Sequence, residues 1–384
     1  MKKLFTALIL LIAMIIPINS FNAVAESDIL NSKSKSALLM NFHGGEIIYA
    51  YNENAKLPIA SMCKIMTLVL IFEDIEAKNM SFEDEIQISE NASGMGGSQA
   101  FLEANGTYKV NDLVKSIIIA SANDSCVAFA EKIAGSENAF VEKMNERAAQ
   151  LGMSNTIFSN CTGLPKPNQY STAKDVATML RELLKHKEYY NYSRIWMDEI
   201  KHSGGRITGL TNTNKLIRFY EGCDGGKTGY TSEAGHCLAA SANRGGMRLV
   251  SVVIGAPDSK TRFEETKTLF NYGFANYSNK MLVDDKRPLD EKVKISNGKI
   301  NEISVIAAKP YFRFTKRNEK ENIVMEFSKN SKIKAPISKG DIIGQINIYK
   351  DNVKLDTIDV LANESVESKT IFDYIQDIAE DWNI

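Results

Sequence analysis

The hydrophobic pattern of the chain is densest between residues 58 and 72, which read PIASMCKIMTLVLIF. After Pro58 this run has no glycine or proline and is apolar on nearly every helical face, which predicts a buried helix over residues 61–76. Pro58 suits the entry to that helix, because proline cannot continue a helix backwards. Ser61 and Lys64 would lie one turn apart on the same side. A lysine in a buried helix is costly unless it has a partner or a chemical role.

The periodicity on either side of this run predicts an α+β domain. Two β-like runs at 36–40 and 46–51, joined by a turn at residues 43–45, predict a hairpin before the buried helix. Strands after the helices complete the same antiparallel sheet, so the helices form an insert within it. The further helices are expected at 111–121 (capped by Asn111), 124–134, 137–151 and about 172–185, the further strands at 226–231, 236–241 and 247–254, and a closing helix at 259–277.

The pattern changes near Pro288, where short alternating runs begin. Runs at 302–306, 323–327, 342–349 and 354–358 are separated by turn residues at regular spacing, which predicts a small all-β sandwich or barrel. The expected division is therefore a main domain at 26–283, an all-β domain at 284–370 and an amphipathic helix at 371–384. The main domain is expected to have one antiparallel sheet with a helical insert.

The two ends of the chain carry their own signals. Lys2 and Lys3, an apolar stretch at 4–18 and the sequence Ala23-Val-Ala25 are typical of a signal peptide over residues 1–25, which predicts export to the cell envelope. At the other end, apolar residues of 371–384 share one helical face and acidic residues cover the other. A membrane-surface helix usually carries basic residues there, so peripheral membrane contact and packing on a protein partner both stay open.

Composition narrows the class of function. The formal net charge is −1, which gives no reason to expect nucleic-acid binding. The five cysteines contain no C-x-x-C pair and the four histidines no H-E-x-x-H spacing, so neither a metal site nor a dense disulfide framework is indicated. The glycine-rich loop at 91–99 lacks the G-K-[ST] ending of a phosphate-binding loop.

Candidate chemistry begins with Ser61 and Lys64. A serine hydroxyl needs a base, and burial can lower the pKa of a lysine enough for it to serve. The spacing S-x-x-K is not specific by itself, and S-x-N is commoner still. Ser121 and Asn123 differ from the other S-x-N matches because they stand at a break between two predicted helices. The motif K-T-G occurs once, at Lys227, Thr228 and Gly229. Further S-x-x-K matches include those that begin at Ser32, Ser171 and Ser331.

In this order the three motifs resemble those of the penicillin-recognising serine enzymes. Wider matches, such as residues 58–64, 121–124 and 224–231, look like the low-molecular-mass D-alanyl-D-alanine carboxypeptidases, a family of penicillin-binding proteins. The resemblance covers about residues 28–370. It implies a hydrolase of peptidoglycan stem peptides that end in D-Ala-D-Ala, inhibited by acylating β-lactams, with no metal or organic cofactor. Removal of the terminal D-alanine would limit cross-linking during cell-wall biogenesis.

The resemblance also implies a role for each motif residue. Ser61 attacks the carbonyl between the two D-alanines, Lys64 takes its proton, and Ser121 relays a proton to the leaving amine. Asn123 binds the substrate amide. The remaining implied groups are Lys227, Thr228 and Gly229 on the substrate-binding strand, and an oxyanion hole made by the N–H groups of Ser61 and of a K-T-G strand residue, for which Tyr230 is the candidate.

Two rival functions remain at this stage: a β-lactamase of the same fold, and an inactive envelope protein that binds peptidoglycan. No loop glutamate stands in the context that a class A β-lactamase needs. Less specific interpretations also exist for single residues. Arg262 is expected to be an exposed helix arginine rather than a contributor to the site, and Asp175 a first-turn residue favoured by the helix dipole.

Overall fold

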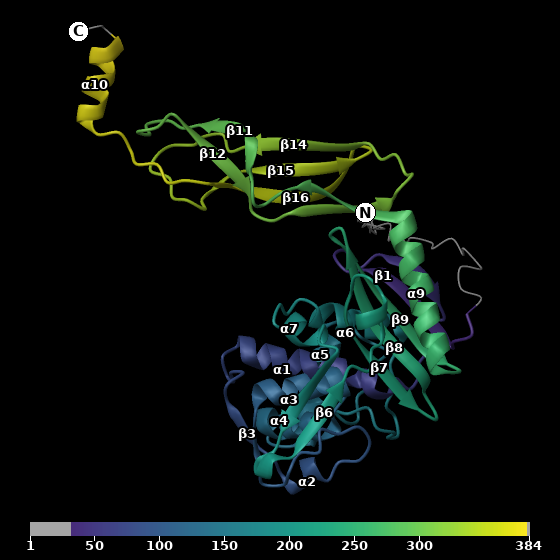
Figure 1. Cartoon of the computed structure of the whole chain (residues 1–384). Coiled ribbons are helices and arrows are strands. Elements are labelled where there is room, and N and C mark those ends of the chain that lie inside the picture. Colours follow the sequence, from purple (N-terminus) through teal and green to yellow (C-terminus); the bar gives the residue numbers. More distant parts are fainter. Residues whose placement is uncertain (1–31, 382–384) are drawn as a thin grey trace, which may run out of the picture.

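The computed structural model describes residues 32–381, with side chains up to residue 378. Figure 1 shows a mixed helical and β body, an elongated β module next to it, and a separate helix at the far end of that module. The predicted signal peptide at residues 1–25 lies outside the described residues. In the part that is described, no helix has both the length and the apolar character needed to cross a membrane.

The main domain is built on an antiparallel sheet in the order β2-β1-β9-β8-β7, with β7 at one edge. Its first two strands come from the N-terminal part of the domain and its last three from the C-terminal part, as the sequence predicted. The strands are β1 (Ser36–Asn41), β2 (Ile47–Tyr51), β7 (Cys223–Thr231), β8 (Gly235–Arg244) and β9 (Met247–Ala256).

Alternate residues along β1 pack into two different hydrophobic cores, one on each face of the sheet. On β1, Leu38 and Met40 face the core shared with the helical insert, whereas Ala37 and Leu39 face the core under α9 (Ser259–Asn276). This is the two-residue period of a strand buried on both faces. Figure 1 shows α9 lying along one face of the sheet while the insert packs against the other. The predicted α+β class, with an antiparallel sheet and a helical insert, is therefore confirmed.

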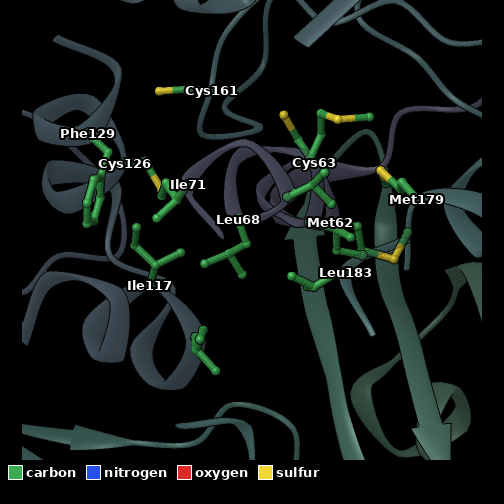
Figure 2. Close-up of a cluster of buried hydrophobic side chains, with 14 of the residues drawn as sticks. Met62, Cys63, Leu68, Ile71, Ile117, Cys126, Phe129, Cys161, Met179 and Leu183 are labelled. Carbon is green, nitrogen blue, oxygen red and sulfur yellow. The ribbon is translucent and has the colours of Figure 1, made fainter. Parts of the chain in front are cut away.

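The insert surrounds α1 (Lys64–Glu76), which follows a 3-10 turn, η1 (Ala60–Cys63). Figure 2 shows side chains from several helices closing around it, among them Ile117, Phe129 and Met179. Burial of this apolar surface is the main force that holds the insert together. The other helices are α2 (Glu90–Ser93), α3 (Val110–Ala120), α4 (Asn123–Ala134), α5 (Glu137–Gln150), α6 (Ala173–Leu183), α7 (Tyr189–Ser193) and α8 (Leu216–Phe219).

Helix ends were predicted with mixed success. α4 ends at Ala134, as expected, and Gly135 follows it in the left-handed region. α6 begins close to the expected position, where Thr172 caps it by accepting a hydrogen bond from the Asp175 N–H. The predicted cap at Asn111 is wrong. The residue lies inside the first turn of α3, and its side chain accepts a hydrogen bond from the Tyr192 hydroxyl, so a tertiary contact takes the place of a local cap.

Two small hairpins were missed by the sequence analysis. One pairs β3 (Glu85–Gln87) with β4 (Thr107–Lys109), and the other pairs β5 (Met197–Lys201) with β6 (Ile207–Thr211) across the short turn η2 (Ser203–Gly205). Within strands β5 and β6, only Ile200 and Leu210 are buried. A strand with so few buried positions leaves no alternating apolar signal to detect.

The C-terminal module is all-β, as predicted. Its sheet runs β11-β12-β16-β15-β14, and a separate pair joins β10 to β13. Because β10 pairs with a strand of the module, we propose that the domain boundary lies near Tyr277 rather than at residue 284. The strands are β10 (Tyr277–Val283), β11 (Pro288–Lys294), β12 (Glu302–Ala307), β13 (Tyr311–Lys316), β14 (Ile323–Lys329), β15 (Ile342–Lys350) and β16 (Val353–Ala362).

The last helix, α10 (Ile371–Asp381), stands away from the main domain at the end of the module (Figure 1). Its apolar side chains point into solvent, with Phe372 82% exposed and Ile375 57% exposed. The predicted amphipathic helix is thus present within the described residues, whereas Trp382, which the pattern assigned to the apolar face, lies beyond them.

Candidate active site

The candidate nucleophile and its base lie where α1 begins. Ser61 is in the 3-10 turn, Lys64 is the first residue of α1, and the Lys64 Nζ donates a hydrogen bond to the Ser61 Oγ at 3.0 Å. Ser61 is half-buried, while the Lys64 side chain is completely buried. The juxtaposition expected from the three-residue spacing is therefore present.

The environment of Lys64 disfavours a charged amine. Burial lowers the pKa of Lys64 below the ordinary lysine value, because the charged form loses its hydration. The Nζ also donates to the backbone carbonyl of Thr162, on the loop before α6. This second bond holds the amine towards Ser61. A neutral lysine amine in this position can accept the proton of the serine hydroxyl.

Backbone strain accompanies the nucleophile. Ala60, directly before Ser61, has φ +47°, a left-handed conformation that is rare for a residue with a side chain. Gly163 packs so tightly beside it that a Cβ atom there would lie 2.0 Å from the Ala60 carbonyl oxygen. Only glycine fits at this point, so the loop after Thr162 fixes the turn that presents Ser61.

Ser121 and Asn123 stand at the break between α3 and α4, as predicted. Ser121 has φ +65°, which turns the chain sharply between the two helices. Its Oγ and the Asn123 Oδ1 are buried, and neither has a hydrogen-bond partner among the described residues. Buried polar atoms without a partner are costly, and they are common where a ligand completes the bonding. The Asn123 Nδ2 donates to the Gly96 carbonyl at 2.6 Å.

The K-T-G strand, β7, forms another wall of the site. Lys227 is buried, and its Nζ donates to the Thr228 carbonyl at 3.1 Å. Burial, followed by the nearby charge of Lys64, holds the pKa of Lys227 well below its usual value. An incoming carboxylate would favour the charged form again. The Thr228 Oγ1 donates to the Thr213 Oγ1 at 2.9 Å.

Gly229 brings this strand against the nucleophile turn. A Cβ atom at Gly229 would lie 2.7 Å from the Ile59 carbonyl oxygen and 3.1 Å from the Ser61 backbone nitrogen. The sequence analysis expected some group to approach the backbone at this glycine, and the approaching group is the turn that carries Ser61. The K-T-G strand is thus in direct contact with the turn that carries Ser61. The S-x-N motif lies at the start of α4, and α4 packs against α1.

The expectation for Arg262 is wrong. This side chain is 9% exposed rather than on the surface, and its Nη1 donates to the carbonyls of Gly229 at 3.1 Å and Cys237 at 3.2 Å. It therefore supports the backbone of β7 from α9. Asp175 does lie in the first turn of α6, and its carboxylate also accepts a hydrogen bond from the Thr156 hydroxyl at 2.8 Å.

Sequence reasoning missed two supporting groups. The Asp124 carboxylate is fully buried and accepts hydrogen bonds from the N–H groups of Ala100 at 3.0 Å and Leu102 at 3.1 Å, which ties a loop to the start of α4. The Asn160 Oδ1 accepts from the Gly163 N–H at 2.7 Å and shapes the loop beside Ser61. The Asp124 contacts have no local sequence signal, because their partners lie 22 and 24 residues away. Asn160 and Gly163 are three residues apart, and an asparagine just before a glycine-containing loop is a signal that could have found this contact.

The described residues contain no cluster of His, Cys, Asp or Glu side chains that could hold a metal ion. All five cysteines have free, buried thiols. Cys63 and Cys126 flank α1 in Figure 2, and burial raises the pKa of the Cys126 thiol to about 12. These thiols are packing groups rather than nucleophiles.

Comparisons with known proteins agree with this geometry. Residues 22–258 match the family model described as D-alanyl-D-alanine carboxypeptidase, and residues 277–368 match that of the penicillin-binding protein 5 C-terminal domain. The D-alanyl-D-alanine carboxypeptidase DacF of Bacillus subtilis is 39% identical over 354 residues, which span 92% of this chain and 91% of that protein.

Solved structures show the same relationship. Penicillin-binding protein 5 of Haemophilus influenzae aligns with a TM-score of 0.68 and 29% identity, covering 88% of this chain and 98% of that one. Penicillin-binding protein D2 of Listeria monocytogenes, solved in an ampicillin-bound form, aligns with a TM-score of 0.57 and 30% identity, covering 64% of this chain and 99% of that one. The predicted family is thereby confirmed: the chain belongs to the D-alanyl-D-alanine carboxypeptidase family of penicillin-binding proteins.

Proposed function

We propose that this protein is a serine carboxypeptidase that removes the terminal D-alanine from peptidoglycan stem peptides. The observation that carries the proposal is the contact between the Ser61 hydroxyl and the completely buried amine of Lys64, 3.0 Å apart. A hydroxyl with a desolvated amine beside it is suited to attack an acyl carbon. Loss of the terminal D-alanine deprives the peptide of the bond that a cross-linking enzyme would open, so the reaction limits cross-linking.

In the proposed acylation step, the Ser61 Oγ bonds to the carbonyl carbon of the penultimate D-alanine. The hydroxyl proton passes to the Lys64 amine, and the peptide C–N bond breaks. Ser121 relays a proton to the nitrogen of the leaving D-alanine. In support of this role, the Ser121 Oγ is buried and has no other partner in the described chain. Water then attacks the acyl-enzyme, releasing the shortened peptide and restoring the Ser61 hydroxyl.

The substrate is proposed to lie along β7. Lys227 and Thr228 bind the terminal carboxylate, and Asn123 hydrogen-bonds the substrate amide. The N–H groups of Ser61 and Tyr230 form the oxyanion hole, where a single donor contributes about 3–4 kcal/mol in related acyl transfers. The support for this arrangement is the close approach of Gly229 to the Ser61 nitrogen, because it places two backbone segments side by side. The protein's own residues supply all the groups in this mechanism.

A fluorescent penicillin distinguishes this function from its rivals. Stable labelling that disappears in Ser61→Ala, together with D-alanine release from a pentapeptide, is the expected result. Rapid turnover of the penicillin would instead indicate a β-lactamase. Absence of both labelling and D-alanine release would indicate an inactive peptidoglycan-binding protein.

Export and membrane contact are further parts of the proposal. Residues 1–25 act as a signal peptide, so that the mature enzyme begins at Glu26 and works outside the cytoplasm. The exposed apolar face of α10, which includes Phe372 and Ile375, makes peripheral contact with the membrane surface. N-terminal sequencing of the secreted protein tests the cleavage site, where a mature chain that still begins at Met1 would contradict export by this route.

A further inference from the structure

A β-bulge interrupts β7 directly before the K-T-G motif. Cys223 pairs with Ala242 of β8. Gly225, two residues further along β7, pairs with Ser241, which is only one residue further along β8. Asp224 is therefore the extra residue on β7. Bulges of this kind often occur beside active sites, where they change the direction of a side chain.

The bulge decides which face of the sheet carries Lys227. Cys223 belongs to the core under α9. Side chains of an unbroken strand alternate between faces, so Lys227, four residues later, would point to that same face. The extra residue reverses this direction. Lys227 pairs with Ala239, which belongs to the core shared with the insert, and directly opposite residues of two strands lie on one face. The bulge thus turns Lys227 towards the helical insert, which carries Ser61 and Lys64.

Two side chains of α7 hold the backbone of the bulge. Because β7 lies at one edge of its sheet, the backbone groups on its outer side need partners other than a strand. The Gly226 N–H donates to the Tyr189 hydroxyl at 2.9 Å. The Ser193 hydroxyl donates to the Asp224 carbonyl at 2.5 Å. α7 therefore holds the bulge on both sides of Gly225.

Tyr189 is itself firmly placed. Its side chain is 1% exposed, and its ring lies edge-to-face with Phe72 at 6.1 Å. A Cβ atom at Gly225 would lie 2.8 Å from the Tyr189 Cε1, so only glycine leaves room for the ring there. By contrast, the Lys227 Nζ donates only to the Thr228 carbonyl within the described chain. The direction of the Lys227 side chain thus depends on the backbone of the bulge.

We propose that α7 orients Lys227 through this bulge, and that Tyr189 is a positioning residue for binding of the substrate carboxylate. The Tyr189 hydroxyl is buried and acts through the Gly226 N–H, one residue before the cation. Without the hydroxyl, that N–H loses its partner and the bulge can shift, which moves the ammonium group away from the carboxylate. This inference rests on the proposed function, because that function assigns the carboxylate to Lys227 and Thr228.

Two ligands test the role of Tyr189: diacetyl-L-Lys-D-Ala-D-Ala and the same peptide with a C-terminal amide. Dissociation constants are measured by NMR titration of the Ser61→Ala protein, which cannot be acylated. We expect the acid to bind at least about tenfold more tightly than the amide. Adding Tyr189→Phe should reduce this ratio about fivefold, the usual effect of one lost hydrogen bond. In the otherwise wild-type enzyme, Tyr189→Phe should raise KM for the acid about fivefold and change kcat less than about twofold.

Tyr192→Phe is the matched control. Tyr192 lies on the same helix and is 7% exposed, but its hydroxyl donates to the Asn111 Oδ1 of α3 at 2.7 Å and not to β7. This variant should leave the ratio of the two affinities unchanged. Lys227→Met supplies a second test, because Tyr189→Phe should have no further effect on either affinity once the cation is gone.

Three results would overturn the positioning role: a ratio that Tyr189→Phe leaves unchanged, an equal reduction by Tyr192→Phe, or weaker binding of the acid by Tyr189→Phe in the Lys227→Met background. A preference for the acid that survives Lys227→Met would instead overturn the carboxylate site of the proposed function. Failure of the wild type to release D-alanine from the acid would overturn the proposed reaction, while the two dissociation constants still decide the role of Tyr189.

Discussion

At the scale of single residues, the site depends on two lysines that the fold buries for different purposes. Lys64 is fixed by hydrogen bonds to the Ser61 hydroxyl and the Thr162 carbonyl. Among the described residues, the Lys227 Nζ donates a hydrogen bond only to the Thr228 carbonyl of its own strand, and its proposed partner is the substrate carboxylate. Burial lowers the pKa of both amines. Removing a lysine amine from water costs free energy, and in the proposed mechanism each amine has a partner that offsets this cost during the reaction.

The lowered pKa of Lys64 predicts how acylation depends on pH. In the proposed mechanism the neutral amine is the base, so the rate of labelling by fluorescent penicillin should rise with pH and level off below 10.5, the ordinary lysine value. Lys64→Met should reduce that rate by about 10²–10⁴-fold, the usual contribution of a general base. Stopped-flow labelling between pH 5 and pH 10 measures the profile. A rate that falls as pH rises would contradict this role.

Lys227→Met should weaken substrate binding without lowering the free energy of unfolding. The variant loses the cation for the substrate carboxylate, so KM for a D-Ala-D-Ala peptide should rise at least about tenfold. Its free energy of unfolding should stay equal or increase by about 1–2 kcal/mol, because an unpaired buried amine is removed. The folded-state pKa is lowered, so the unfolded chain binds more protons and the wild type gains stability as pH rises.

The stability advantage of Lys227→Met should therefore shrink between neutral pH and 10.5. Urea unfolding of both proteins at several pH values provides the measurement. A variant that is clearly less stable at neutral pH would show that Lys227 is a structural residue instead.

At the scale of elements, the proposed mechanism requires β7 to lie close to the turn η1. Gly229→Ala would place a Cβ atom 2.7 Å from the Ile59 carbonyl and push the two segments apart. A displacement near 1 Å can cost about 10²-fold in rate, so we expect a loss of that size in penicillin labelling. Gly209→Ala is the control, since a Cβ atom at that position would have no non-neighbouring atom of the described chain within 4 Å. Equal labelling rates for the two variants would contradict the proposed arrangement.

The start of α4 is a second element that positions the site. Asp124→Asn should lower the free energy of unfolding by about 2 kcal/mol, because the amide can accept only one of the two loop hydrogen bonds and its NH₂ group faces a backbone N–H. Asp112→Asn, which alters only a partly exposed ion pair with Lys115, should cost less than about 1 kcal/mol. Comparable losses in the two variants, measured by urea unfolding, would contradict this view of Asp124.

At the scale of the whole molecule, the catalytic domain and the β module have separate cores. Three kinds of contact join them. The His43 ring stacks on Phe312 at 5.0 Å, and Phe314 packs against the edge of the core under α9. Arg317 donates hydrogen bonds to the carbonyls of Asn276 and Phe274. Domains that have their own cores can generally fold alone. The catalytic domain should therefore be separable from the module.

A chain of residues 26–276 should consequently be labelled by penicillin at a rate within about a factor of two of the full protein. A soluble, folded chain that is not labelled would show that the module shapes the site. For α10, a chain ending at residue 370 should lose the vesicle binding that the full protein is proposed to have. Co-sedimentation with phospholipid vesicles measures it, and equal sedimentation of the two chains would contradict membrane contact through this helix.

The sequence by itself determined the local elements and the candidate groups. The apolar run after Pro58 predicted α1 because a fully buried helix is apolar on all faces, and the three-residue spacing predicted the contact of Ser61 with Lys64. The alternation of apolar residues found the strands of the main sheet and four strands of the β module. It missed strands whose side chains are mostly exposed or half-buried and leave no periodic signal, namely β3, β4, β5, β6, β10, β11 and β13.

Only the tertiary structure decided which distant groups support those residues. The Thr162 carbonyl reaches Lys64 across 98 residues, Arg262 turns inward onto β7, and Asp124 anchors a loop that precedes it. A cavity beside Ala60 likewise combines segments around residues 56–60, 163–170 and 231–233. Hydrogen bonds and cavities depend on positions in space, and those are set by packing between segments that carry no mark of one another in the sequence.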